Sequence, residues 1–376
     1  MSDKKILFIA NKCPPYRVPF FNRIAKKSDI TFLFVNEEDK IADLESPQKI
    51  LKGKGLGKYK IHPGVTSFIK EFDLVVFLPP DFSHLIDNIM MYVYCKIKKI
   101  PYIIWTERWR YKKVPLKDKF AEIFYRKMYL DARSMVVSGK RSYEYISSLK
   151  VKNKIFIAPD ASEVLYDKKK IDKLKRQILK KYKLKNKKII LYVGRLISRK
   201  GINYLISAFS KLKDKNAILL IVGGGDFYNL GEKSIEFKLK EQVKKLNLEK
   251  KIIFVGEVNH SDTAAYYFLA DVFVTPSITE KISEPWGLTL NEAMQFGLPV
   301  IATDAVGAAY DLIKNGKNGF MVKEKDSKEL KKTIEKIINN EKLRNKMGKE
   351  SLKIIKEKNN YEKMVEGFLE AIRSIK

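Results

Sequence analysis

Residues 284–302 read EPWGLTLNEAMQFGLPVIA, and this pattern sets the expected architecture of the chain. They follow an apolar run at residues 270–277 that is typical of a buried strand. The pattern then predicts a short helix at residues 290–296, which Gly297 ends. Another buried strand is expected at residues 300–302. The stretch is therefore predicted to form a strand–helix–strand unit.

Two acids, Glu284 and Glu292, bracket the N-terminus of this predicted helix. A helix N-terminus offers unpaired N–H groups and a partial positive charge, which suit a phosphate. The two carboxylates could then hold sugar hydroxyls on either side of that phosphate. The simpler interpretation is a surface helix whose acids only favour its own dipole.

The spacing of Glu284 and Glu292, with seven residues between them, resembles the E-x7-E signature of retaining glycosyltransferases of family 4. The resemblance implies the GT-B fold: an α/β protein with two doubly wound Rossmann-like domains facing a central cleft. It also implies that Glu284 contacts the donor sugar and Glu292 the ribose of the nucleotide. The N–H groups around Gly287, Leu288 and Thr289 would hold the diphosphate.

The composition favours a globular protein, because 45% of the residues are hydrophobic. A chain of 376 residues is longer than one hydrophobic core ordinarily supports, so two domains are expected. The net charge of +31 is spread over both halves of the chain. A general attraction to anionic surfaces or substrates is expected, and no nucleic-acid-binding motif is present. The two cysteines, Cys13 and Cys95, fit a reducing compartment. We expect a cytoplasmic protein, peripheral on the inner face of the membrane.

The first half, residues 1–165, alternates buried apolar runs with amphipathic stretches, as a doubly wound parallel sheet does. Six strands are expected, at residues 6–10, 30–35, 74–78, 102–105, 135–137 and 155–157. The loop after the first of them contains Arg17 and no glycine, which argues against NAD binding there. By resemblance this half is the acceptor side. Arg17 faces either the acceptor, a phosphate or solvent.

Glu107 is the polar candidate at the end of the strand 102–105, where many members of the resembling family place a histidine. We expect Glu107 to take part in catalysis. The segment 108–127 is basic and rich in aromatic residues. It either lies at an anionic membrane interface or packs its aromatic rings inward and leaves its cations in solvent. Asp160 follows the last strand of this half, where members of the family that this sequence resembles carry an Asn-Gly turn, so no role is assigned to it.

The second half carries a cationic loop, GRLISRKG at residues 194–201, between a predicted strand and a predicted helix. The loop resembles the G-R-L-x-x-x-K-G loop of the same family. Cleavage of a sugar–phosphate bond leaves negative charge on the diphosphate, and Arg195 and Lys200 can stabilise it. No Asp-x-Asp metal-binding pair occurs in the sequence. We therefore expect neither a metal nor a cofactor, and a UDP- or GDP-sugar as the donor substrate.

Further strands are expected at residues 189–193, 217–222, 252–258 and 320–322. The strand 217–222 ends in Gly223-Gly224-Gly225, which lets the backbone approach a ligand or a neighbouring strand closely. By resemblance, the backbone of Val255 and Gly256 receives the nucleotide base.

The expected domains are residues 1–165 for the acceptor, residues 186–352 for the nucleotide sugar, and a helix at 353–376 that crosses back to the first domain. The resemblance implies transfer of a sugar to a saccharide or lipid-linked acceptor, with retention of the anomeric configuration. Two alternatives stay open. One is another GT-B enzyme, an epimerase or a phosphorylase, and the other is a non-catalytic carbohydrate- or surface-binding protein.

Overall fold

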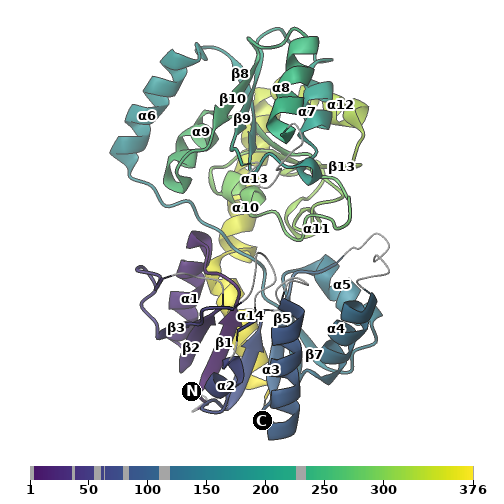
Figure 1. The fold of residues 1–376 in the computed structure, drawn as a ribbon. Coiled ribbons are helices and arrows are strands. Elements are labelled where there is room, and N and C mark those ends of the chain that lie inside the picture. Colours follow the sequence, from purple (N-terminus) through teal and green to yellow (C-terminus); the bar gives the residue numbers. More distant parts are fainter. Residues whose placement is uncertain are drawn as a thin grey trace. The chain divides into compact units, whose positions relative to one another are not determined.

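A computed structural model describes residues 4–35, 39–54, 61–62, 64–78, 84–109, 119–225 and 234–375. The chain forms two compact units (Figure 1). The first comprises Met1–Ala161 together with Asn360–Lys376, and the second comprises Ser162–Asn359. Each unit is built on a parallel sheet, as the alternating pattern predicts.

The first unit contains a seven-stranded sheet of order β3-β2-β1-β4-β5-β6-β7. Its strands are β1 (Ile6–Ala10), β2 (Ile30–Phe34), β3 (Gln48–Ile50), β4 (Leu74–Phe77), β5 (Tyr102–Thr106), β6 (Ser134–Val137) and β7 (Lys154–Ile157). Six of these match the predicted strands to within one or two residues. The sequence did not predict β3, and β7 is an edge strand with Ile157 46% exposed rather than a buried one.

Helices cover both faces of this sheet. The described helices are η1 (Pro15–Arg17), α1 (Val18–Ala25), α2 (Val65–Ile69), α3 (Leu85–Lys98), α4 (Lys119–Asp131), α5 (Lys140–Ser148) and α14 (Tyr361–Arg373). α1 and α14 share a core with one face, where Phe8, Phe20 and Phe368 meet. α2, α3, α4 and α5 share a core with the other face. The last helix thus belongs to the first unit, and a side chain at Gly367 would overlap the carbonyl of Ile157 in β7.

The second unit contains a six-stranded sheet of order β10-β9-β8-β11-β12-β13. Its strands are β8 (Lys188–Val193), β9 (Ala217–Val222), β10 (Ile252–Gly256), β11 (Val272–Thr275), β12 (Val300–Thr303) and β13 (Gly319–Val322). Its helices are α6 (Lys168–Lys181), η4 (Ser198–Lys200), α7 (Ile202–Phe209), α8 (Ile235–Lys245), η5 (His260–Asp262), α9 (Thr263–Leu269), α10 (Leu288–Gln295), α11 (Ala309–Leu312), α12 (Ser327–Ile338) and α13 (Glu341–Lys358).

In both sheets the strand order reverses at one point, the topological switch point. In the first, β1 lies between β2 and β4, and in the second, β8 lies between β9 and β11. Ligands of doubly wound sheets bind off the carboxyl ends of the strands at such a switch point. The loops after β1, β4, β8 and β11 are therefore the candidate ligand-binding loops. Within the described ranges, no helix combines the length and the apolar character needed to cross a membrane.

Candidate functional site

The switch point of the second sheet brings together the two motifs that the sequence singled out. The cationic loop follows β8 and the loop with Glu284 follows β11, and these strands pair in parallel. Lys200 Nζ lies 2.8 Å from Glu284 Oε2, and Arg199 Nη1 lies 3.1 Å from the same oxygen. All three side chains are at most 15% exposed. Two cations and one carboxylate thus form a cluster with excess positive charge.

The charge state of Glu284 follows from this cluster. Burial opposes its ionisation, but Lys200 and Arg199 outweigh burial and hold the pKa of this carboxyl below its ordinary value. Glu284 is therefore an anion at neutral pH. Such a buried carboxylate can orient sugar hydroxyls, while the cations beside it can accept a diphosphate.

A glycine and backbone hydrogen bonds fix the positions of the cationic loop and of the segment that leads to Glu284. Gly201 has φ +63°, and a side chain there would overlap the carbonyl oxygen of Pro276 at the end of β11. Ile278 N donates to Arg199 O at 2.8 Å, and Glu284 N donates to Ala305 O at 2.9 Å. The cationic turn thus packs directly on the segment that leads to Glu284.

The side chain of Arg195 is exposed, whereas that of Lys200 is only 13% exposed. The backbone carbonyl of Arg195 accepts a hydrogen bond of 2.9 Å from Tyr192 Oη. Its charge also helps to lower the pKa of Glu284, after those of Lys200 and Arg199. Arg199, which the sequence did not single out, is the arginine that pairs with the carboxylate. The loop motif predicts a cationic turn but not which arginine points inward.

Glu292 lies in α10 and is 5% exposed. Its Oε1 accepts a hydrogen bond of 2.9 Å from Ser162 Oγ, and its Oε2 accepts one of 2.9 Å from Tyr267 Oη. His260 Nε2 lies 3.0 Å from Oε1, and the hydrogen bond to Glu292 raises the pKa of His260, although partial desolvation of the ring acts in the opposite direction. Burial and then Glu292 raise the pKa of Tyr267 well above its ordinary value. These three partners could not be predicted from the sequence, because they come from distant segments.

The N-terminus of α10 contains the predicted phosphate-binding groups. The helix begins at Leu288, two residues earlier than predicted, and Gly287 precedes it at φ +101°. Leu288 and Thr289 lie in its first turn, where N–H groups lack an intrahelical acceptor. Trp286 Nε1 donates to Asn291 Oδ1 at 3.0 Å, which fixes the entry to the helix. Gly297 has φ +70°, as expected for the residue that ends it.

Val255 and Gly256 end β10, the edge strand of the second sheet. β9 lies between β10 and β8, so these two residues are two strands away from the strand that precedes the cationic loop. Gly223 N donates to Gly256 O at 2.9 Å, and Leu196 N donates to Gly224 O at 3.1 Å. The glycine turn after β9 therefore connects the cationic loop to the end of β10 by backbone hydrogen bonds.

The first unit has a charged cluster of its own. Arg17 Nη1 lies 2.8 Å from Asp160 Oδ1, and Arg17 Nη2 lies 2.6 Å from Glu107 Oε1. The Arg17 guanidinium also stacks 4.2 Å from the ring centroid of Trp105. Arg17 and Asp160 are buried, whereas the side chain of Glu107 is 27% exposed. The structure thus gives Asp160, to which the sequence assigned no role, a direct contact with Arg17.

The proton affinity of Glu107 is unusual. Burial and then the negative charge of Asp160 raise its pKa to about 8, although Arg17 acts in the opposite direction. Burial lowers the pKa of Arg17, but Asp160 and Glu107 outweigh that effect and raise it. Glu107 therefore titrates near neutral pH beside a permanent cation, as a general acid or base requires.

Three buried side chains in the described part of the first unit are of the types that bind metal ions and lie close together: His62, His84 and Asp87. Asp87 Oδ1 accepts a hydrogen bond of 2.8 Å from His62 N, and Asp87 Oδ2 lies 2.7 Å from His62 Nδ1. Because His62 engages both carboxylate oxygens, the group is a hydrogen-bonded histidine–aspartate pair. It belongs to a different unit from the predicted diphosphate site.

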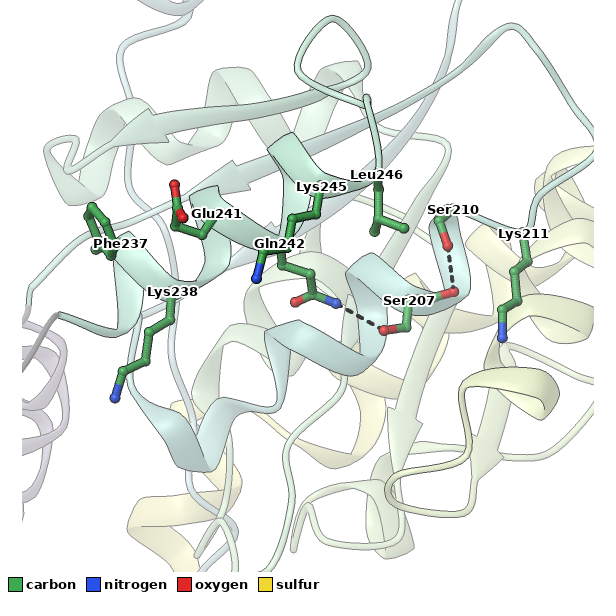
Figure 2. Close-up of a pocket in the computed structure, with 9 residues that line it drawn as sticks. All are labelled: Ser207, Ser210, Lys211, Phe237, Lys238, Glu241, Gln242, Lys245 and Leu246. Atoms are coloured by element: carbon green, nitrogen blue, oxygen red, sulfur yellow. Dashed lines mark hydrogen bonds between the residues drawn. The ribbon is translucent and has the colours of Figure 1, made fainter.

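A surface cavity of about 590 Å³ lies between α7 and α8 (Figure 2). Gln242 Nε2 donates to Ser207 Oγ at 3.0 Å across it, and Lys211, Lys238 and Lys245 line its sides. It contains none of the predicted site residues. This cavity is therefore separate from the predicted donor site.

The match to a known protein family falls within the second unit. Residues 174–354 match the model of the family described as glycosyl transferases group 1. An uncharacterised glycosyltransferase of Methanocaldococcus jannaschii is 34% identical over 154 residues, which cover 41% of this chain and 36% of that protein. The capsular polysaccharide biosynthesis glycosyltransferase CapM of Staphylococcus aureus is 31% identical over 217 residues, which cover 56% of this chain and 53% of CapM.

The chain spans about a third to about a half of the length of these curated relatives. The crystal structure of Anabaena HepE in complex with UDP is similar over 99% of this chain and 100% of that chain. The TM-score is 0.79 at 18% identity, so this likeness concerns the fold. The chain therefore has the GT-B fold, and its residues 174–354 match the model of the glycosyl transferases group 1 family.

Proposed function

We propose that this protein is a glycosyltransferase that moves a sugar from a nucleotide-sugar donor to a saccharide or lipid-linked acceptor, with retention of the anomeric configuration. The contact of Lys200 and Arg199 with Glu284 at the switch point of the second sheet carries the proposal. It combines the cations that a leaving diphosphate needs with a carboxylate that can orient the sugar.

The donor lies against the second unit in this proposal. Lys200, Arg199 and the exposed Arg195 receive the diphosphate together with the N–H groups around Leu288 and Thr289. Glu284 orients the transferred sugar, Glu292 binds the ribose, and the backbone of Val255 and Gly256 receives the base. UDP in the similar HepE structure supports a uridine nucleotide as the donor.

In the reaction, the bond between the anomeric carbon and the phosphate oxygen breaks, and the acceptor oxygen takes the place of the phosphate. Negative charge grows on the diphosphate, and the cations of the second unit stabilise it more as it grows. We assign this role to Arg195, Arg199 and Lys200 without a metal. Glu107, held by Arg17, contacts the acceptor, and in its ionised form it takes the proton that the acceptor hydroxyl loses.

We place the reaction in the cytoplasm, at the inner face of the membrane. Cys13 and Cys95 are both buried, and neither is in a disulfide, which fits a reducing compartment. The biosynthesis of a capsular polysaccharide, which the name of CapM states, supports a saccharide acceptor of the cell envelope.

The test is a transfer assay with the purified chain, a panel of UDP- and GDP-sugars, and saccharide and lipid extracts as acceptors. We expect one donor to release its nucleoside diphosphate only when an acceptor is present, and NMR of the product to show the donor's anomeric configuration. Arg195→Ala should abolish transfer, whereas Lys211→Ala, which removes an exposed cation outside the site, should not. Consumption of the donor without an acceptor would indicate an epimerase, and binding without turnover a carbohydrate-binding protein.

A further inference from the structure

Two neighbouring helices of the first unit expose apolar side chains to solvent. In α3, Ile86, Val93 and Ile97 are 51%, 43% and 70% exposed. They are seven and four residues apart, so they form one stripe along the helix. Because a helix that covers a sheet ordinarily turns polar residues outward, this stripe requires an explanation.

α4 repeats the pattern. Phe120, Ile123 and Leu130 are 68%, 70% and 38% exposed, with spacings of three and seven residues. The opposite side of α4 is buried in the core through Tyr125 and Met128. Its exposed apolar residues are therefore additional to the core and not part of it.

The two stripes belong to one surface. α3 and α4 contact each other on the same face of the first sheet (Figure 1). Asn88 Nδ2 donates to Tyr125 Oη at 3.0 Å, and Tyr92 Oη donates to Asp131 Oδ2 at 2.6 Å. Along both helices these hydrogen-bonded residues follow the same order, so α3 and α4 run parallel. The exposed apolar stripe of α3 therefore lies next to that of α4.

The other exposed residues of this surface are basic. Where burial is described for α3 and α4, every exposed residue that is not apolar is a lysine or an arginine: Lys96, Lys98, Arg126 and Lys127. The described acids of the two helices are Asp87, which is buried, and Asp131 and Glu122, whose side chains are 16% and 28% exposed. Asp131 is paired with Lys96 at 3.2 Å and with Lys127 at 3.2 Å, and Glu122 with Arg108 at 3.5 Å. Apolar side chains flanked by cations, with no exposed acid among them, match a bilayer that contains anionic lipids.

We propose that the exposed face of α3 and α4 seats the protein on an anionic lipid bilayer. The inference rests on the proposed function, because a lipid-borne acceptor gives the enzyme a reason to bind there. Both helices begin at the carboxyl edge of the first sheet, since α3 follows β4 and α4 follows β5. Glu107 follows β5 at the same edge, and a seated bilayer brings a lipid-linked acceptor towards it.

Sedimentation of the full chain with vesicles tests this surface. Vesicles of phosphatidylcholine with a quarter phosphatidylglycerol should bind the protein, more weakly as NaCl rises from about 0.1 to 0.5 M. Ile97→Glu combined with Ile123→Glu should raise the lipid concentration for half-maximal binding at least tenfold. The matched control is Leu165→Glu combined with Leu352→Glu, at two exposed leucines of the second unit, which should bind as the unchanged protein does.

The remaining readouts separate the outcomes. Circular dichroism must show that both double variants are folded, and nucleoside diphosphate binding should be the same in each. Equal vesicle binding by the unchanged protein and by Ile97→Glu/Ile123→Glu overturns the proposal, as does binding to no vesicle. If the unchanged protein is a dimer and only Ile97→Glu/Ile123→Glu is a monomer, the exposed face of α3 and α4 binds a second copy of the chain instead of a bilayer, and the proposal is overturned. Vesicle binding without any sugar transfer would leave this surface standing and refute the proposed function alone.

Discussion

Lys200 Nζ and Glu284 Oε2 lie 2.8 Å apart, so a predicted phosphate-binding cation contacts the predicted sugar-binding carboxylate. Arg199 shares that carboxylate, which leaves the cluster with more cations than anions. A diphosphate can therefore enter with Glu284 still ionised. Glu284 in turn keeps Lys200 extended towards the switch point before any ligand arrives, and such preorganisation lowers the cost of binding.

Lys200→Ala should lower kcat/KM for the nucleotide sugar about 10²- to 10³-fold, the usual cost of removing one group that stabilises transition-state charge. The measurement is steady-state kinetics with the donor that the transfer assay identifies. Lys211→Ala should change kcat/KM little, because Lys211 lies at the cavity between α7 and α8. Activity of Lys200→Ala within threefold of the unchanged protein would refute the role of this lysine.

Glu292→Ala should weaken both the fold and nucleotide binding. The change leaves the hydroxyls of Ser162 and Tyr267 without their acceptor in a buried place, which costs about 1–3 kcal/mol. Urea denaturation measures this cost, and Glu292→Gln should reduce it because its amide oxygen still accepts a hydrogen bond. Both variants should bind a nucleoside diphosphate at least about tenfold more weakly if Glu292 holds the ribose. Loss of stability without loss of nucleotide binding would make Glu292 a purely structural residue.

Gly201→Ala should destabilise the protein and displace the cationic loop. The glycine adopts a left-handed φ of +63°, and a side chain there would overlap the carbonyl oxygen of Pro276. Gly316→Ala is a matched control, because Gly316 has φ +78° and nothing within 4 Å of an added side chain. We expect both to lose stability through backbone strain of about 1–3 kcal/mol, with the larger loss for Gly201→Ala. Only Gly201→Ala should also lose donor affinity, and equal donor affinities would show that the loop tolerates the shift.

Glu107 should make the reaction depend on pH. Its pKa of about 8 means that it is protonated below this pH and ionised above it. If the ionised form accepts the proton of the acceptor hydroxyl, kcat/KM rises as pH rises through about 8, and Glu107→Gln removes that limb. A raised acid pKa also means that its contribution to stability is present below about 4.5 and lost as pH rises through about 8. An unchanged pH profile in Glu107→Gln would exclude this role.

The regular part of the fold was predictable because buried parallel strands are continuous apolar runs. The strand β9 at Ala217–Val222 has the predicted ends, and its six residues are all buried. The strand β3 at Gln48–Ile50 was missed, since it is a three-residue edge strand with no buried residue. Periodicity carries no signal in so short and exposed a segment.

The candidate site was predictable only where its residues are close in the sequence. The loop 194–201 and the pair Glu284 and Glu292 carry motifs, so their general chemistry could be predicted. Ser162 is 130 residues from Glu292, and Asp160 is 143 residues from Arg17, so these contacts depend on tertiary structure. For the same reason the sequence could not show that Arg199, rather than Arg195, pairs with Glu284.

Donor binding is the central claim, and a thermal-shift panel of UDP, GDP, ADP, dTDP and CMP, with and without EDTA, tests it most directly. A ligand that binds only the native state raises the Tm by mass action. We predict that one nucleoside diphosphate raises the Tm of the unchanged protein equally with and without EDTA, and that Lys200→Ala loses this shift. A shift that EDTA abolishes would contradict the metal-free assignment. No shift with any nucleotide or with the corresponding nucleotide sugars would contradict the donor site itself.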